Sequence, residues 1–295
     1  MNDAEKPLAP GLYLVATPIG NLEDITLRAL RVLQSVDRIA CEDTRQTQKL
    51  LNHFDIKKPP VSYHLHNENE RAGDLLQELR AGGRIAIVSD AGTPGIADPG
   101  GRVVQAAIAA GIPVFPVPGA NAAVSALIAS GLPAESFVFH GFLPSKAGQR
   151  KTFLEKLPHA VADSDTQEGG TPPTHIFYEA PHRILETLAD VEAVFGSAHV
   201  IVVARELTKL HEEFLRGTVA EVHAALAARD TVRGEIVLLL SGQFGGNTAQ
   251  ASLADAMRAL LKDGLSEKDA LKRVARERGL GKSDAYREWQ RVRGQ

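Results

Sequence analysis

Residues 85–101 read IAIVSDAGTPGIADPGG, and this stretch decides the fold. The unbroken apolar run 85–88 predicts a strand buried on both faces, which delivers Ser89 and Asp90 into a loop rich in glycine and proline. In open α/β sheets, ligands bind at the carboxyl ends of the strands. Glycine lets the backbone approach a ligand closely, and Asp90 can accept hydrogen bonds from ribose hydroxyls or an ammonium group. A purely turn-forming role would also explain the loop, so both interpretations stay open.

The composition bounds the class of protein. With 295 residues, 44% of them hydrophobic, the chain can bury a full core and is expected to form two domains with a small appendage. No apolar run approaches the ~20 residues that a membrane span needs. The N-terminus lacks the basic-then-apolar pattern of a signal peptide, so we expect a cytoplasmic protein. The single cysteine, Cys41, excludes an internal disulfide and is expected to be buried, and the sequence requires no metal.

Strand and helix patterns alternate along the chain. Five strand–helix repeats over residues 11–133 predict an N-terminal α/β domain with a parallel sheet. Residues 134–245 contain a second set of strands and helices and predict a C-terminal α/β domain. Residues 246–295 form a linker followed by helical segments. The fold class is therefore α/β, with two domains and a small C-terminal helical extension.

The net charge of −3 conceals a difference along the chain. Residues 251–295 hold 11 Lys and Arg against 7 Asp and Glu, a local charge of +4, which leaves −7 for residues 1–250. A polyanionic partner would therefore favour the C-terminal end, although a solvated helical face explains the charge as simply. The basic residues that gather in one predicted helix are Lys268, Lys272, Arg273, Arg276 and Arg278. Tyr286 and Trp289 follow and could stack on bases, but packing onto the domain is the simpler role.

Several familiar sites are absent. The turn after the first strand is TPIGN, which lacks the dinucleotide pattern G-x-G-x-x-G, and Gly281-Lys282-Ser283 lacks the leading glycine of a phosphate-binding loop. No Gly-x-Ser-x-Gly elbow occurs. A nicotinamide dehydrogenase, a nucleotide kinase and a serine hydrolase are therefore disfavoured.

Polar residues follow other predicted strands as well. Glu42, Asp43 and Arg45 come at the end of the predicted strand RIACE, where an ion pair could hold the loop or the side chains could contact substrate. His64 and His66 alternate along an extended segment and so point to the same face. No third ligand lies nearby, so a base or hydrogen-bonding role is favoured over a metal, with ordinary structural histidines an equal alternative.

The chain as a whole resembles the ribosomal RNA small subunit methyltransferase I family of the tetrapyrrole methylase superfamily. The stretches that carry the resemblance are LYLVATPIGNLEDITLRAL, CEDTR, SDAGTPGIADPG, VPGANAAVSALIASGLP, GFLP, YEAPHR, VARELTKLHEE and RGEIVLLL. The resemblance implies two α/β domains with S-adenosylmethionine in the cleft between them, and a homodimer. It also implies methylation of the ribose 2′-hydroxyl of a cytidine in the decoding region of 16S ribosomal RNA, within the small subunit.

The resemblance implies the site residues too. The implied cofactor contacts are Thr17, Pro18, Gly20, Ser89, Asp90, Pro118, Gly119, Asn121, Ala122, Tyr178, Glu179 and Leu207. Ser89 replaces the glycine that tetrapyrrole-modifying members usually have, which argues against a porphyrin-like substrate. Arg45 and the basic residues of the extension are the candidate RNA contacts.

A sulfonium cofactor brings its own leaving group, so the protein need only align the reacting atoms and assist loss of the hydroxyl proton. The titratable groups that could do so are Asp90, Asp98, Glu42, Asp43, His64 and His66, and the sequence does not choose among them. Two competing functions remain open. A small-molecule methyltransferase would share the cofactor site, and a non-catalytic ribosome assembly factor would keep only the basic extension.

Overall fold

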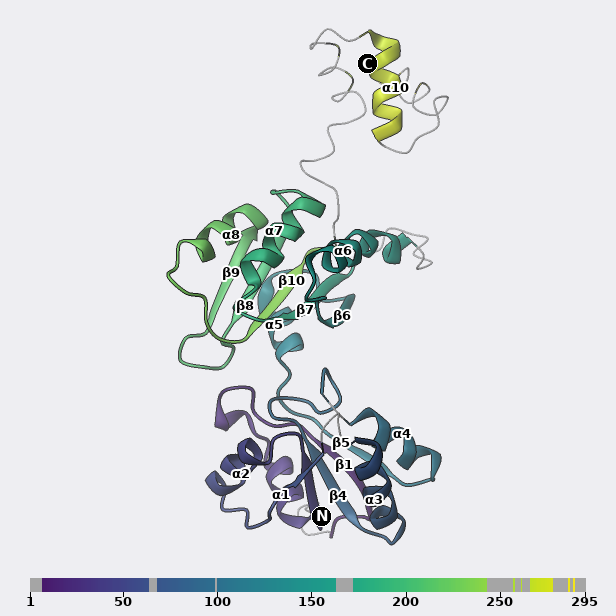
Figure 1. The fold of residues 1–295 in the computed structure, drawn as a ribbon, viewed down its shortest axis with the longest axis vertical. Coiled ribbons are helices and arrows are strands. Elements are labelled where there is room, and N and C mark those ends of the chain that lie inside the picture. The colour runs from purple at the N-terminus through teal and green to yellow at the C-terminus, as the bar shows by residue number, and fades with distance from the viewer. Residues whose placement is uncertain are drawn as a thin grey trace.

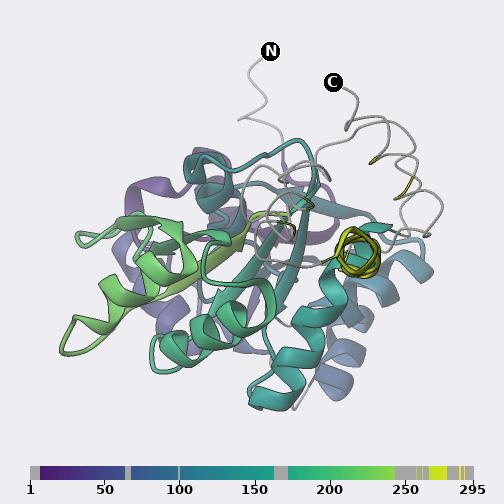
Figure 2. The same ribbon diagram turned by 90° about the horizontal axis from the view of Figure 1, so that it is seen from above.

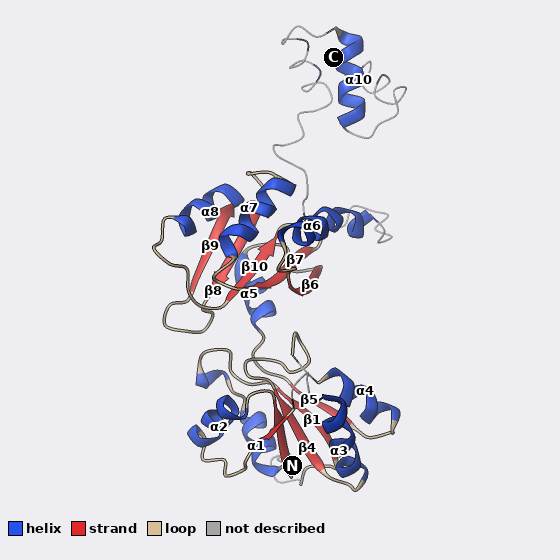
Figure 3. Cartoon of the chain, viewed as in Figure 1, coloured by secondary structure: helices blue, strands red, loops and turns tan. Residues whose placement is uncertain are grey.

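The computed structural model describes residues 7–63, 68–98, 100–162 and 172–242, together with 257, 261, 266–277, 286 and 289. Two five-stranded sheets follow one another along the longest axis in Figure 1. Helices flank both sheets, as the colouring by secondary structure in Figure 3 shows. This arrangement confirms the predicted α/β class.

The first sheet is parallel throughout, as predicted, with the order β3-β2-β4-β1-β5. Its strands are β1 (Gly11–Val15), β2 (Arg38–Cys41), β3 (Val61–Ser62), β4 (Arg84–Val88) and β5 (Val114–Val117). The central strand β4 is buried on both faces, because Ile85 and Ile87 join one apolar cluster while Ala86 and Val88 join another. The parallel strands bring their carboxyl ends, and the loops that follow them, to one edge of the sheet.

Helices cover both faces of this sheet. Cys41 is buried, as predicted, in the cluster formed with α1 (Leu27–Ser35) and α2 (Thr44–His53). The opposite cluster is formed with α3 (Glu68–Arg80) and α4 (Gly101–Ala109). Alternation along β1 sends Leu12 to one cluster and Tyr13 to the other, as the period of two requires.

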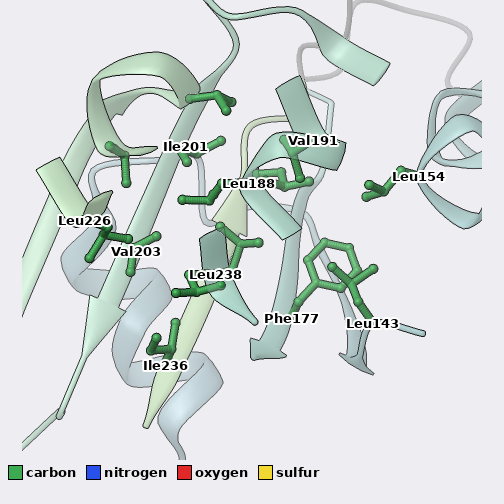
Figure 4. Close-up of a cluster of buried hydrophobic side chains, with 14 of the residues drawn as sticks. Leu143, Leu154, Phe177, Leu188, Val191, Ile201, Val203, Leu226, Ile236 and Leu238 are labelled. Carbon is green, nitrogen blue, oxygen red and sulfur yellow. The ribbon is translucent and has the colours of Figure 1, made fainter. Parts of the chain in front are cut away.

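The second sheet is mixed, with the order β6-β7-β10-β8-β9. Its strands are β6 (Phe137–Phe142), β7 (Thr174–Glu179), β8 (Val200–Arg205), β9 (Glu213–Thr218) and β10 (Ile236–Leu240). Only β6 and β7 pair in parallel, and the remaining pairs are antiparallel. One face packs against α6 (Ala147–Ala162), α7 (Ile184–Phe195) and α8 (Val219–Ala227), and Figure 4 shows Leu188, Phe177 and Leu238 in this core.

Helix α5 (Ala122–Ser130) covers the other face of the second sheet. Its small residues Ala123 and Ala126 allow close approach to the strands. Arg216 of β9 donates hydrogen bonds to the carbonyls of Ser130 (3.1 Å) and Ala129 (2.6 Å), where a cation complements the negative helix end. The predicted N-terminal domain, 11–133, includes this helix, whereas its packing is with the second sheet.

The described part of the C-terminal extension contains α10 (Glu267–Glu277). Its axis lies along the long axis of the molecule in Figure 1 and is seen nearly end-on in Figure 2. Ala270 and Val274, one turn apart, are buried, and Trp289 is buried with its indole donating to Glu267 (2.6 Å). The contact recorded for Trp289 is therefore with α10 of the extension itself, whereas Tyr286 is 53% exposed.

Two histidines are enclosed around the second sheet. His175 is 1% exposed and His199 6% exposed, and burial lowers the pKa of each to about 4. His140 lies 2.8 Å from His175, ring nitrogen to ring nitrogen, and burial lowers its pKa as well. These side chains are neutral in the folded protein at neutral pH, and unfolding returns them to water.

The free energy of unfolding is therefore expected to fall as the pH drops from 6.5 to 4, because the unfolded chain binds more protons in this window. The loss amounts to at most about 3 kcal/mol for each of these histidines. Urea unfolding at several pH values measures the slope. His175→Gln and His199→Gln should each flatten it, and His211→Gln, at an exposed position, should not. Equal slopes in all three variants would contradict the prediction.

Candidate functional site

Loops from both sheets line one cavity of 390 Å³. From the first half of the chain come residues that follow β1, β4 and β5: Ile19, Asp90, Ala91, Gly92, Thr93, Ile96, Ala97, Asp98, Asn121 and Ala122. From the second sheet come Phe142, Tyr178, Glu179, Ala180, Pro181, Leu207, Gly234, Glu235, Ile236 and Val237. The cavity therefore lies at the carboxyl edge of the first sheet, where the topology predicts a ligand site.

The loop after β1 is tied to the loop after β4. Thr17 and Gly92 form an isolated antiparallel bridge, with N–H···O distances of 2.9 and 3.1 Å. The Thr17 hydroxyl also donates to the carbonyl of Ser89 (3.0 Å). Gly92 has φ +84°, and a Cβ there would lie 3.1 Å from Cγ2 of Ile19. Only glycine fits this position without displacing a wall of the cavity.

The loop after β5 is held to the same structure. Asn121 caps α5 by accepting a hydrogen bond from the amide of Val124 (3.1 Å). The Thr93 hydroxyl donates to the carbonyl of Ala120 (3.1 Å). These contacts join the third loop to the other two, so the first-sheet wall of the cavity is one hydrogen-bonded unit.

The four carboxylates that line the cavity differ in whether they have a basic partner. Glu179 is buried and paired with Arg183, and it also accepts from the Thr187 hydroxyl (2.7 Å). Glu235 pairs with Lys209 at 2.9 Å. Asp90 and Asp98 have no basic partner among the described residues, and none of the residues that line the cavity is Lys, Arg or His. The cavity thus carries uncompensated negative charge, which favours a cationic ligand.

An apolar wall completes the cavity. Tyr178 stacks edge-on against Phe139 and Phe142, and burial raises the pKa of its phenol, so the hydroxyl stays protonated. Leu207 and Ile19 add aliphatic surface from opposite sheets. A ligand with both an apolar part and a positive charge would match these walls.

Only some of the predicted cofactor contacts line the cavity. Those that line the cavity are Asp90, Asn121, Ala122, Tyr178, Glu179 and Leu207, and those that do not are Thr17, Pro18, Gly20, Ser89, Pro118 and Gly119. Ser89 is buried beneath the loop, and Thr17 holds the loop in place. Gly20 has another role, because a Cβ there would lie 2.4 Å from Cγ of Lys209. Its lack of a side chain lets the first-sheet loop touch the loop after β8.

Of the predicted bases, Asp90 and Asp98 line the cavity, whereas Glu42 and Asp43 do not. Asp43 caps α2 and forms an ion pair with Arg45 at 3.3 Å. This geometry corresponds to the alternative in which an ion pair holds the loop. The backbone N–H of Asp43 does reach the site, because it donates to Oδ1 of Asp90 (3.1 Å). His64 and His66 lie outside the described residues.

Sequence reasoning missed part of the second wall. Phe142 and Pro181 lie in the stretches GFLP and YEAPHR, and Gly234 and Glu235 lie in RGEIVLLL, so the quoted motifs already contained them. Nothing in their spacing placed them at one cavity, because the antiparallel pairing of β7 with β10, with Ile236 opposite Glu179, brings the end of one strand to the start of the other.

The candidate RNA contacts are surface residues. The Arg45 side chain is 87% exposed, and Lys268, Lys272 and Arg273 are exposed on α10. The side chain of Arg276 lies outside the described residues. None of the described helices combines the length and apolar character needed to cross a membrane. Nor do the described residues include a group of three His, Cys, Asp or Glu side chains that could hold a metal ion.

Comparison with known proteins gives a consistent result. The sequence profile described as Tetrapyrrole (Corrin/Porphyrin) Methylases matches residues 11–223. A protein of Halalkalibacterium halodurans named Ribosomal RNA small subunit methyltransferase I is 49% identical, over 93% of each chain. The chain belongs to this methyltransferase I family of tetrapyrrole methylases. Another member, from Bacillus subtilis, is 43% identical over 93% of this chain and 92% of its own.

Solved structures agree on the fold of this tetrapyrrole methylase. The methyltransferase CobJ superposes with a TM-score of 0.57 at 16% identity, over 79% of this chain and 95% of its own. Diphthine synthase gives a TM-score of 0.57 at 11% identity, over 79% and 91%. At such low identity these likenesses concern the architecture alone.

The glycines of the loop after β4 provide a test of the cavity wall. Gly92 and Gly95 have φ of +84° and +81°, but a Cβ at Gly95 meets nothing within 4 Å. Gly95→Ala should therefore lower the free energy of unfolding by about 1 kcal/mol, the cost of the left-handed backbone alone. Gly92→Ala should lower it by about 2–3 kcal/mol, because it also overpacks Ile19. Equal losses in chemical denaturation would contradict this account of the wall.

Proposed function

We propose that this protein transfers a methyl group from S-adenosylmethionine to the 2′-hydroxyl of a cytidine in the decoding region of 16S ribosomal RNA. One observation carries the proposal: 49% identity, over 93% of both chains, to a protein named Ribosomal RNA small subunit methyltransferase I. The cytidine and its 2′-oxygen rest on the family resemblance. We further infer that the substrate is the assembled small subunit in the cytoplasm, and that the enzyme is a homodimer.

The cavity between the sheets suits this cofactor. When bound, S-adenosylmethionine supplies an activated methyl group on a positively charged sulfur, with a neutral thioether as leaving group. Asp90 and Asp98 carry negative charge into a cavity whose other walls are largely apolar, and this combination favours a cation with an apolar body. Ile19, Leu207 and Val237 offer surface for a flat ring.

Asp90 is the residue that we assign to cofactor binding. It lies two residues after the end of β4, and its Oδ1 accepts the backbone N–H of Asp43 (3.1 Å). This contact fixes the carboxylate and leaves its other oxygen for ribose hydroxyls or an ammonium group. Asn121, which faces the same cavity from the start of α5, adds an amide that can donate or accept.

The basic residues of the extension are assigned to RNA. Lys268, Lys272 and Arg273 are exposed on α10, and Lys268 and Lys272, one turn apart, lie on the side away from the buried Ala270 and Val274. Exposed cations on a helix suit a phosphate backbone, and each phosphate contact adds a salt-dependent contribution to affinity. Arg276 follows on the same segment and is assigned to RNA as well. The exposed Arg45 of α2, beside the first sheet, is a further RNA contact in this proposal.

The direct test is methylation of small ribosomal subunits by the purified protein with isotope-labelled S-adenosylmethionine. Nuclease digestion and mass spectrometry then locate the methyl group. The proposal expects one added methyl on the ribose of a cytidine. A methyl on a base contradicts the ribose assignment, and transfer to a small molecule but not to RNA favours a small-molecule methyltransferase. Failure of the protein to bind the cofactor in calorimetry would point to a non-catalytic assembly factor.

The role of α10 leads to a separate prediction. Replacing Lys268, Lys272 and Arg273 with Gln should lower the slope of log K against log salt for RNA binding by about 2, because each phosphate contact contributes about 0.7–0.9. The affinity for S-adenosylmethionine should not change. A matched control replaces three exposed cations elsewhere, Arg28, Lys57 and Arg71, with Gln. Equal slopes for the two triple variants would leave α10 as a packing element only.

A further inference from the structure

An open groove of 650 Å³ runs along α6, the helix that lies beside β6 and β7 in Figure 1. It shares no lining residue with the cofactor cavity. The turn before α6 contributes Pro144 and Lys146. The helix contributes residues at the spacing of three and four that defines one helical face, among them Gln149, Phe153 and Lys156. The groove is therefore formed by a single continuous segment of the chain.

The groove is cationic. Lys146 and Lys156 are exposed, and neither forms an ion pair with a described residue. The neighbouring Lys151, in contrast, is paired with Asp190 at 3.4 Å and does not line the groove. Glu155 of the same helix is not a lining residue either, so the described wall of the groove carries no acid. Positive charge that is not compensated locally attracts a polyanion.

Between the two lysines the groove has an apolar surface. Phe153 is half-buried and is anchored edge-on against His140 (5.5 Å between ring centroids) and Phe177 (6.2 Å). Pro144 adds a second apolar surface, and Gln149 adds an amide that can donate or accept. An apolar surface flanked by cations suits a nucleotide, because the base or ribose packs on the ring while the phosphate contacts the ammonium groups.

The turn that carries Lys146 is held from both sides. Arg150 is 1% exposed, pairs with Asp190 at 2.7 Å, and donates to the carbonyls of the two residues before Lys146 (3.5 and 3.3 Å). Arg183 donates to the carbonyl of Leu143 (3.0 Å). Because the backbone is fixed in this way, only the side chain of Lys146 loses freedom when it binds a ligand.

The same turn connects the groove with the cofactor cavity. Phe142, at the end of β6, lines the cavity, and Pro144 lines the groove. Their Cα atoms are at most about 7 Å apart, since two residues of chain separate them. An RNA strand that places one ribose in the cavity therefore brings its neighbouring nucleotides to the groove.

We propose that this α6 groove binds the RNA strand next to the methylated nucleotide, with Lys146 and Lys156 contacting phosphates and Phe153 packing against a base or ribose. The inference rests on the proposed function. It adds a contact surface beside the second sheet to the contacts assigned to α10 and Arg45. The groove contributes to the affinity and placement of the substrate and takes no part in the chemical step.

Gly148 allows the groove to be tested by charge alone. It lines the groove, and an added Cβ there meets nothing within 4 Å. Gly148→Glu and Gly148→Gln have the same shape, and both remove a glycine from a helix, so they differ in the charge placed in the groove. At low salt Gly148→Glu should bind small ribosomal subunits about 10-fold more weakly than Gly148→Gln. The difference should shrink as salt is raised, and both should keep the parent affinity for S-adenosylmethionine in calorimetry.

Removal of the two cations gives an independent measure. Lys146→Gln/Lys156→Gln should lower the slope of log K against log salt by about 1.5, because each phosphate contact contributes about 0.7–0.9. The control Arg28→Gln/Lys57→Gln removes two exposed cations elsewhere and should leave the slope unchanged. In methyl transfer the groove variant should raise KM for small subunits and keep kcat within about twofold of the parent value.

A crosslink tests the position of the groove along the RNA. Cys41 is the only cysteine and is buried, so Gln149→Cys provides one accessible thiol for a photoreactive label. Crosslinks to the strand that contains the methylated cytidine support the proposal. Crosslinks confined to other parts of the subunit contradict it.

Two further results would overturn the inference while the parent protein still methylates ribosomal RNA, so that the proposed function stands. One is equal binding by Gly148→Glu and Gly148→Gln at low salt together with equal slopes for the two double variants. The other is a charge effect that is lost with protein-free 16S ribosomal RNA, which would assign the groove to a protein of the subunit. If the parent transfers no methyl group to ribosomal RNA, the proposed function fails and the inference fails with it.

Discussion

The backbone bridge between Thr17 and Gly92 is the contact on which the site depends. It joins the loops that follow β1 and β4, two strands that are neighbours in the sheet but far apart in the chain. The Thr17 hydroxyl extends the connection to Ser89, and the Thr93 hydroxyl extends it to the start of α5. Loops held in this way lose little further freedom on binding, so binding energy is not spent on ordering them.

The second sheet supplies the opposite wall, and its position depends on close approach. Gly20 leaves room for Lys209, which is held between Glu206 and Glu235 at 2.9 Å from each. Helix α5 contributes its N-terminal end to the cavity while its body packs on the second sheet and Arg216 secures its C-terminal end. Helix α5 therefore packs on the second sheet and, at its N-terminal end, joins the first-sheet loops in lining the cavity. Its small side chains make both contacts compatible.

The sequence predicted much of this arrangement, for identifiable physical reasons. Four apolar residues without alternation indicated that β4 is buried on both faces, and regular strand–helix alternation indicated a parallel sheet. Carboxyl-end loops then placed Asp90 and Asn121 at the ligand edge. The packing of α5 was not predictable, because apolar spacing shows that a face is buried but does not identify its partner. The bond from Ser89 to Asp98 depends on the path of the loop, which residue types alone do not define.

The central claim is that loops of both sheets close on a single cofactor, and hydrogen–deuterium exchange with and without S-adenosylmethionine tests it most directly. The account predicts that added cofactor slows amide exchange together in peptides covering 89–98, 119–124, 178–181 and 234–237, with no change in α6. Protection confined to the peptides of one sheet, or no protection at saturating cofactor, would contradict it.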